Sequence, residues 1–533
     1  MKKYFSPLNL LLLAAAIFYL IFIARTSFLA NNQRYFTLID DAMISMRYAR
    51  NLAQGHGLVW NIGQPPVEGF TNLGWLLVMA ILHLIPFSPA YISLVVMLIA
   101  AIILLANTFV VFRITQTLDS SARLAPFIAA TITAFYFPIV FWSLRGLEVG
   151  ALTLTIDFAI LLALRLTLWP KLATVYWLTL VLGLAVLIRM DAFLQAAILL
   201  IYISVTLNTA KSFRLNNRDS SATTLPQNDT TKNKLFIIGL PVLFTLLVLA
   251  GILIFQRFYF GDFLPNTYYL KVTGVTAWER IRVGLLSLND YASRDFLMPL
   301  VFALIGLATI KELHRRESLL LLSLFLVQIG YSVWVGGDYA EELVNAANRF
   351  IAQGMPALFI LFALVLDHFV QNVSTVQFRP IVAIAIGIGA LFVVSGEPWA
   401  NWMISNAPML RTDIQRVRIG LHIKATTKPD AVIAVHAAGQ IPYFSERTAI
   451  DLLGKSDPVI AKGPPATSFA PGHNKWNYSY SILTLKPDLI ADNFNKLAAF
   501  MKDVSEYRLL PNGIYVRVDS TRVNFVTLAK DYK

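Results

Sequence analysis

Long apolar runs recur along most of this chain, and they restrict its fold more than any other feature of the sequence. An α-helix needs about 20 mostly apolar residues to cross the roughly 30 Å hydrocarbon core of a bilayer. Charged residues make up only 14% of the sequence, whereas a soluble domain carries about 25%. The sequence therefore excludes a soluble globular protein and predicts about eleven membrane-spanning helices. These helices are expected near 8–28, 90–112, 124–142, 149–168, 172–190, 192–208, 235–256, 295–310, 318–336, 349–370 and 380–397.

One further apolar run, 70–85, is shorter and is bounded by prolines on both sides. If this run only dips into the outer leaflet and returns, every basic loop falls on the cytoplasmic side, which is where membrane proteins keep positive charge. If it crosses fully, the basic group at 311–316 moves outside. We therefore predict a re-entrant segment, a cytoplasmic N-terminus and an outer C-terminus. The basic residues of these loops are Arg113, Arg123, Arg165, Lys171, Lys211, Arg214, Arg218, Lys232, Lys234, Lys311, Arg315, Arg316 and Arg379.

The net charge and the absence of cysteine exclude several functions. The formal charge of +13 is explained by these cytoplasmic loops. Because the sequence has no basic helix and no stripe of aromatic and basic residues, we expect no nucleic-acid partner. The chain contains no cysteine, which excludes thiol chemistry, Fe–S clusters and cysteine-based zinc sites.

The sequence pattern changes after the last apolar run. From 398 to 533 polar and apolar residues alternate, and 431–435, 488–491 and 513–518 have the composition of short strands. We predict an all-α membrane domain at 1–397 and a small extracytoplasmic α/β domain at 398–533. The stretch 208–234, which is rich in Ser, Thr and Asn, is expected to be a flexible cytoplasmic linker.

The first outer loop carries the strongest local signal. Asp40 and Asp41 stand where an amphipathic helix should begin, with Arg47 one to two turns further on. Aspartate is a preferred helix cap, so one interpretation is structural. Paired carboxylates beside cations also suit general-base catalysis near an anionic substrate. The apolar side of this helix, with Met43 and Met46, is expected to lie on the membrane surface.

Further charged residues stand at the outer ends of predicted spans. They could form structural ion pairs, but ionisable groups at membrane depth are also candidates for function. The preferred topology gathers all of them at one face, and a purely structural account does not predict this. They are Arg145, Glu148, Arg189, Asp191, Asp338 and Arg349.

Several other candidates are individually weak. His56 lies between two glycines and has the pattern of a turn residue, and Glu68 just precedes the re-entrant run. Asn266, Tyr268 and Lys271 follow Pro265 and either bind substrate or form a rigid turn. Trp476 and Tyr478 either stack on acceptor sugar rings or pack in a core, as aromatic residues more often do.

Taken in order, these pieces resemble the GT-C superfamily of integral-membrane glycosyltransferases, and the resemblance covers most of the chain. Within it they look like the bacterial branch that contains the mycobacterial terminal arabinofuranosyltransferases. One departure is Arg189-Met190-Asp191, where Arg-Pro-Asp or Arg-Glu-Asp is expected, although both charges remain. The stretches that carry the resemblance are 40–51, 55–59, 67–72, 146–148, 261–267, 335–338, 438–444 and 450–454.

The resemblance implies a glycosyltransferase of the bacterial cytoplasmic membrane that uses a polyprenyl-phosphate sugar donor and inverts the anomeric carbon. The acceptor would be an envelope glycan or glycoconjugate, and the C-terminal domain would bind it. Asp40 would be the base, and Asp41 would orient it or the acceptor. Arabinofuranose is the sugar suggested by resemblance, and mannose and glucose stay open. The donor-binding candidates are Arg47, His56, Glu68, Arg145, Glu148, Arg189, Asp191, Asp338 and Arg349.

A metal ion in the site and two other functions are the alternatives to this interpretation. Asp40, Asp41 and Glu148 offer oxygen ligands for a divalent cation, but the arginines make a metal unnecessary for neutralising phosphate, so we expect no cofactor. A transporter or flippase of lipid-linked sugars is the main alternative, and it should show internal repeats, which this sequence lacks. A non-catalytic envelope protein would leave the Asp40-Asp41 pair unexplained.

Overall fold

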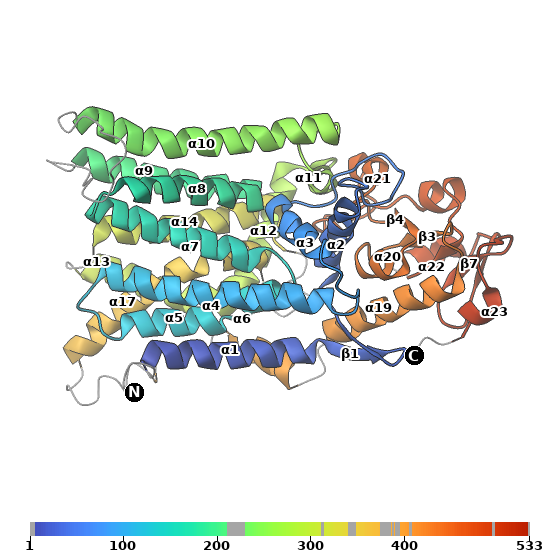
Figure 1. Ribbon diagram of the computed structural model, residues 1–533, viewed down its shortest axis with the longest axis horizontal. Helices are drawn as coiled ribbons and strands as arrows, with labels where there is room; N and C mark the ends of the chain where they lie inside the picture. The colour runs from blue at the N-terminus through green and yellow to red at the C-terminus, as the bar shows by residue number, and fades with distance from the viewer. Residues whose placement is uncertain are drawn as a thin grey trace.

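A computed structural model of the protein describes residues 6–209, 230–310, 314–338, 348–373, 395–404, 408–492 and 496–530, and the single positions 385 and 389. The predicted linker at 208–234 and the predicted span at 380–397 lie mostly outside these residues. Long helices lie side by side in one bundle, and a mixed α/β part sits at one end of it (Figure 1). The helices α2 (Asp40–Ala53) and α3 (Leu73–His83) lie at the junction between the two parts (Figure 1).

Within the described residues, seven helices are long and apolar enough to cross a membrane. An eighth candidate is a pair of helices bent by 46° at a break. Two further predicted spans appear as shorter apolar helices, α8 (Leu172–Ile188) and α13 (Leu297–Thr309). The seven are α1 (Pro7–Arg25), α4 (Ile92–Leu118), α7 (Val149–Leu168), α9 (Phe193–Thr209) with the turn before it, α10 (Thr230–Tyr259), α14 (Arg315–Val335) and α17 (Met355–Val373).

The bent pair replaces the single span that the sequence predicts at 124–142. Helix α5 (Ala125–Phe135) ends, and α6 (Phe137–Leu144) begins with Pro138 in its first turn. Proline has no N–H to bond the carbonyl four residues earlier, which here belongs to Ala134. The Tyr19 hydroxyl donates to that carbonyl instead, at 2.7 Å. The break is therefore satisfied by a side chain of α1, as an apolar surrounding requires.

The ambiguous run at 70–85 forms the short helix α3 (Leu73–His83), which has 11 residues. A helix of this length extends about 16 Å, roughly half of a bilayer core. It packs mainly against α2 (Asp40–Ala53). The expectation that α2 lies on the membrane surface is wrong for its apolar side, because Met43 and Met46 are fully buried within the protein.

The C-terminal part is built on a five-stranded sheet with the order β4-β3-β5-β7-β6. The strands β3, β4 and β5 run parallel, and β7 is antiparallel to both β5 and β6. Three strands overlap the predicted segments, whereas β4 and β6 were not predicted. The strands are β3 (Val432–Val435), β4 (Thr448–Asp451), β5 (Leu489–Ile490), β6 (Tyr507–Leu509) and β7 (Tyr515–Arg517), and the helices are α19 (Pro408–Thr426), α20 (Gln440–Ser445), α21 (Pro458–Lys462), α22 (Leu497–Met501) and α23 (Phe525–Leu528).

Helix α20 docks directly on the start of α2. A Cβ atom at Gly439 would lie 1.9 Å from the carbonyl oxygen of Asp40, so only glycine allows this approach. The Gln440 side chain donates to the carbonyl of Leu38 at 3.0 Å, and the Trp60 indole donates to that of Ala438 at 3.2 Å. These contacts fix the first turn of α2 against the C-terminal part.

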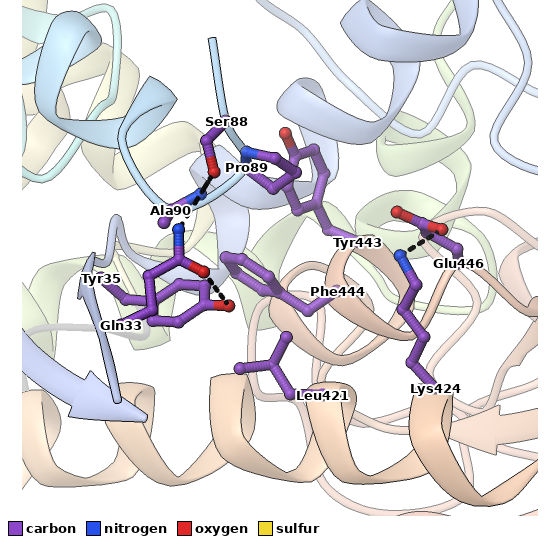
Figure 2. Close-up of a pocket in the computed structure, with 10 residues that line it drawn as sticks. All are labelled: Gln33, Tyr35, Ser88, Pro89, Ala90, Leu421, Lys424, Tyr443, Phe444 and Glu446. Atoms are coloured by element: carbon purple, nitrogen blue, oxygen red, sulfur yellow. Dashed lines mark hydrogen bonds and ion pairs between the residues drawn. The ribbon is translucent and has the colours of Figure 1, made fainter. Parts of the chain in front are cut away.

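A hairpin of β1 (Ser27–Ala30) and β2 (Gln33–Phe36) extends α1 to the same junction. Figure 2 shows the crevice between this hairpin and the helices α19 and α20. The rings of Tyr35, Tyr443 and Phe444 are each no more than 8% exposed. Because these rings are buried against one another's elements and present little surface to a ligand, we interpret the crevice as a packing seam and not as a sugar-binding site.

Candidate functional site

Asp40 stands in the first turn of α2 and is held by the C-terminal part. Its Oδ1 atom accepts the backbone N–H groups of Gly439 at 3.1 Å and Gln440 at 2.9 Å. Among the described residues, Oδ2 accepts no hydrogen bond that meets ordinary geometry. Burial raises the pKa of Asp40 to about 6, and the nearby Arg416 opposes part of that rise. Asp40 is therefore a carboxylate with one fixed oxygen and one available oxygen.

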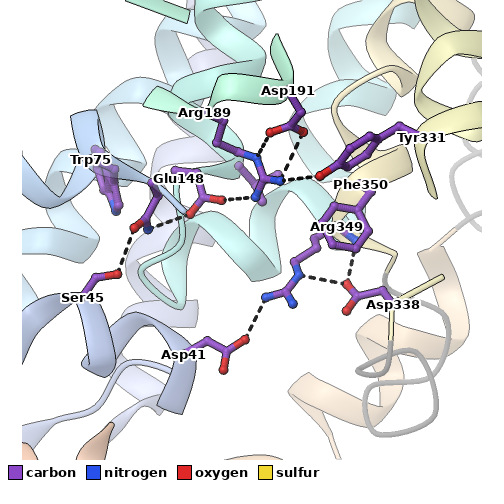
Figure 3. Close-up of polar contacts among 12 residues, drawn as sticks. Asp41, Ser45, Trp75, Glu148, Arg189, Asp191, Tyr331, Asp338, Arg349 and Phe350 are labelled. Carbon is purple, nitrogen blue, oxygen red and sulfur yellow. Dashed lines mark hydrogen bonds and ion pairs between the residues drawn. The ribbon is translucent and has the colours of Figure 1, made fainter. Parts of the chain in front are cut away.

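Asp41 differs from its neighbour because both of its oxygens are in ion pairs. Arg349 donates from Nη1 to Oδ2 at 2.9 Å, and the Lys455 ammonium pairs with Oδ1. Arg349 also lies 3.3 Å from Asp338, measured from Nε to Oδ2 (Figure 3). Burial acts to raise the pKa of Asp41, but Lys455 and Arg349 hold it well below its usual range. Asp41 thus joins α2 to α16 (Arg349–Ala352) and to the C-terminal part.

A second network centres on Arg189, at the end of α8. It donates to both oxygens of Asp191, at 2.8 and 3.1 Å, and to Glu148 at 2.8 Å. The other oxygen of Glu148 accepts from Asn72 at 3.0 Å, and Asn72 accepts from Ser45 of α2 at 3.0 Å. Figure 3 shows this chain of contacts leading back to α2.

The two networks meet around the ring of Phe350. The guanidinium carbons of Arg189 and Arg349 lie 5.6 and 5.3 Å from its centroid. The ammonium of Lys271, in α11 (Asn266–Val272), lies 5.4 Å from it. The face of an aromatic ring attracts cations at such distances. No ion pair of Lys271 occurs among the described residues, and burial together with Arg349 lowers its pKa to about 8.

We call this group the charged cluster. It is partly open, because the side chains of Asp41, Arg349 and Lys455 are 32%, 20% and 17% exposed. Six members were predicted as catalytic or donor-binding residues, and Lys271 was predicted for the acceptor. Lys455 was not predicted. Its members are Asp41, Glu148, Arg189, Asp191, Lys271, Asp338, Arg349 and Lys455.

The structure does not support two arginines that the sequence assigns to phosphate. Arg47 is 4% exposed, and its donors are taken by Asn61 and by the carbonyls of Trp60, Pro442 and Arg447. Arg145 is fully buried and pairs with Asp413 of α19 and with the carbonyl of Thr37. Both assignments are wrong, because these guanidinium groups attach the C-terminal part to the helices.

His56 and Glu68 also lie outside the charged cluster. His56 is exposed in a turn between Gly55 and Gly57, which both have φ of +83°. Glu68 is 5% exposed and accepts from Gln256 at 3.0 Å, while its Oε2 atom is buried without a partner among the described residues. Burial raises the pKa of Glu68 to about 7.

Three predicted acceptor residues have structural roles instead. Asn266 donates to the carbonyls of Gly454 and Lys455, and so holds their loop. Trp476 and Tyr478 stack on each other in the core of the C-terminal part. These three assignments are therefore corrected, because the polar or aromatic groups are used in packing. Tyr268 is 40% exposed, so its acceptor role stays a prediction.

The three carboxylates considered for a metal do not form a ligand set. Both oxygens of Asp41 and of Glu148 are engaged by cationic or amide groups, and Oδ1 of Asp40 accepts backbone N–H groups. In the described part of the chain, no group of three or more His, Cys, Asp or Glu is arranged to hold a metal ion.

Comparison with known proteins gives one family match and several related folds. Residues 408–526 match the family "Domain of unknown function (DUF8728)". No curated protein sequence matches the chain.

Among solved structures, the chain is similar to the Archaeoglobus fulgidus oligosaccharyltransferase tethered with an acceptor peptide. The two are 14% identical, with a TM-score of 0.53, over 84% of this chain and 64% of that one. The oligosaccharyltransferase AglB of the same organism, in complex with an inhibitory peptide and a dolichol-phosphate, matches at 13% identity and TM-score 0.53, over 84% and 64%. This chain thus spans less than two thirds of the length of these proteins.

A third similar structure is ArnT from Cupriavidus metallidurans bound to undecaprenyl phosphate. It is 11% identical, with a TM-score of 0.51, over 83% of this chain and 85% of that one. At such low identity, a structural likeness is evidence about fold and not about activity. The chain therefore has the fold of these solved structures, whereas its membership of the GT-C superfamily and of the arabinofuranosyltransferase branch stays a prediction.

Proposed function

We propose that this protein is a glycosyltransferase that moves a sugar from a polyprenyl phosphate to an envelope glycan on the outer face of the bacterial cytoplasmic membrane. The observation that carries the proposal is the charged cluster at the junction of the bundle and the C-terminal part. Two proteins of the same fold have structures with dolichol-phosphate and undecaprenyl phosphate. Arabinofuranose is the first sugar to test, followed by mannose and glucose.

In the proposed reaction, an acceptor hydroxyl oxygen attacks the anomeric carbon of the donor. The bond between that carbon and the phosphate oxygen breaks with inversion, and the phosphate leaves with the electron pair, still attached to its lipid. Cations are needed where this negative charge develops. Arg349 and Lys271 of the charged cluster are suited to this role. Asp338 orients Arg349, and Glu148 and Asp191 orient Arg189, through the ion pairs described above.

Asp40 is the better candidate for the base that takes the hydroxyl proton. A base is most effective when its pKa lies near the working pH, and burial raises the pKa of Asp40 to about 6. Its Oδ2 atom is also available. Asp41 is a weaker base because Lys455 and Arg349 stabilise its ionised form. Asp41 is proposed to pair with these cations while no donor is bound.

The test uses purified protein in nanodiscs with radiolabelled polyprenyl-phosphate sugars and an envelope glycan acceptor. Asp40→Asn is expected to bind donor but to lose transfer by about 10²- to 10⁴-fold, the range that base catalysis supplies. Because the base must be deprotonated, wild-type transfer should fall as the pH falls through about 6. Asp519→Asn, at a side chain that is 76% exposed, is the control. Near-normal transfer by Asp40→Asn would reject the assignment.

A further inference from the structure

The loop that carries Lys455 is held in place without help from the lysine side chain. Asp451 accepts the N–H groups of Leu453 at 3.0 Å, Gly454 at 3.1 Å and Ser456 at 2.7 Å. From the other side, the Asn266 amide donates to the carbonyl of Lys455 itself at 3.0 Å. The backbone of Lys455 is therefore fixed between β4 and α11, and its side chain projects from a rigid base.

The ammonium of Lys455 reaches the charged cluster from the C-terminal part. It pairs with Oδ1 of Asp41, while Arg349 approaches Oδ2 of the same carboxylate. Lys271 approaches from α11 and shares the Phe350 ring with Arg349. Lys455, Arg349 and Lys271 thus reach the charged cluster from three separate segments, at a place that is partly open to solvent. Asp41 and Asp338 pair with Arg349 and Lys455, whereas no ion pair of Lys271 occurs among the described residues.

We infer that Lys455 is a ligand of the lipid phosphate, so that the C-terminal part completes the donor site together with Arg349 and Lys271. The inference rests on the proposed function and deepens it. In the free protein Asp41 occupies the position between Arg349 and Lys455. The lipid phosphate released by the reaction is a monoester with a charge of about −1.5 to −2 and three acceptor oxygens, so it engages all three cations and takes Lys455 from Asp41.

A purely structural tie between Lys455 and Asp41 is the competing explanation, and the two make opposite predictions for Asp41. Other contacts already join the two parts of the chain, among them the Arg145–Asp413 ion pair and the hydrogen bonds of Arg47. Loss of the Lys455 ammonium is therefore expected to leave the parts docked. If Lys455 binds phosphate, loss of the competing Asp41 charge strengthens phosphate binding instead of weakening it.

The experiment measures binding of undecaprenyl phosphate to the full chain in nanodiscs, with uncharged undecaprenol and inorganic phosphate as separate probes. Lys455→Ala should weaken undecaprenyl phosphate binding about 10- to 100-fold, the range for one charge-assisted contact. Lys455→Arg should retain most of the affinity, and Asp41→Asn should bind more tightly than wild type. Binding of undecaprenol should not change. Displacement of the lipid by inorganic phosphate at equal concentration would assign the site to free phosphate instead.

Lys462→Ala is the matched control, because Lys462 lies seven residues further on and forms an exposed ion pair with Asp262 at 2.7 Å. If Lys455→Ala fails to fold, Lys455→Gln serves in its place. Unchanged affinity in Lys455→Ala, or an equal loss in Lys455→Ala and Asp41→Asn, would overturn the inference. If wild-type protein does not distinguish undecaprenyl phosphate from undecaprenol, the proposed function itself fails.

Discussion

Replacing Arg145 by methionine would leave one of the most buried carboxylates of the protein without its main partner. The side chains of Arg145 and Asp413 are 0% and 1% exposed. After the substitution, Asp413 still accepts a hydrogen bond from the Gln440 side-chain amide at 2.7 Å and still forms an ion pair with Arg416 at 3.9 Å. Removal of one partner of a buried ion pair costs about 3–5 kcal/mol, because the other charge stays buried and uncompensated.

This cost can be converted into a shift of the unfolding temperature. Unfolding entropy is about 2.1 cal/mol/K per residue in globular proteins, which gives roughly 1.1 kcal/mol/K for the 533 residues of this chain. Arg145→Met should therefore lower the midpoint by about 3–5 °C. Thermal unfolding followed by tryptophan fluorescence in one detergent measures this shift.

The double variant Arg145→Met/Asp413→Asn should recover most of the loss. Burial raises the pKa of Asp413 even beside Arg145, so the ion pair compensates its own desolvation only in part. A double variant with the summed loss of both single variants would refute this reasoning, and so would an unchanged midpoint in Arg145→Met. Below its midpoint, Arg145→Met should bind undecaprenyl phosphate like wild type. A loss of that binding would restore Arg145 as a phosphate ligand.

Two further substitutions test buried positions near the site. Burial raises the pKa of Glu68 to about 7 from a usual 4.5, so the folded protein disfavours the ionised form. Glu68→Gln should stabilise the protein at pH 8, by up to about 3 kcal/mol, and the gain should vanish near pH 4.5; an equal gain at both pH values would contradict this. Gly439→Ala should separate α20 from α2 and cost about 1–3 kcal/mol or more, while Gly251→Ala, with open space around it inside helix α10, should be neutral or stabilise the protein by up to about 1 kcal/mol. Equal unfolding temperatures for the two glycine variants would argue against the close approach at Asp40.

The positions of the long helices could be predicted because the bilayer sets their length. The break between α5 and α6 was missed, although Pro138 was visible in the sequence. A proline interrupts an apolar helix only where another group satisfies the freed carbonyl, and here that group is Tyr19, more than a hundred residues earlier. Within the C-terminal part, β4 and β6 are too short to give a clear alternating pattern.

The candidate site could be predicted in part from the membrane topology. Topology placed Glu148, Arg189 and Arg349 at one face of the bundle, and the structure brings them together. The sequence could not separate these arginines from Arg47 and Arg145, since every guanidinium has the same donors. Whether those donors meet solvent or backbone carbonyls depends on residues about 400 positions away, such as Pro442. Lys455 was missed for the same reason, although the adjacent stretch 450–454 contributed to the resemblance.

The close docking of α20 on α2 restricts how the sequence of this chain can evolve. Asp40, Asp41 and Arg145 all take partners from the C-terminal part. In a chimera, these helices would be joined to the C-terminal part of a distant homologue. Several buried charges would then lose their ion-pair or hydrogen-bond partners at once, even if both parts fold well alone. The sequences of the helix bundle and the C-terminal part are therefore expected to diverge together and to resist recombination at their boundary.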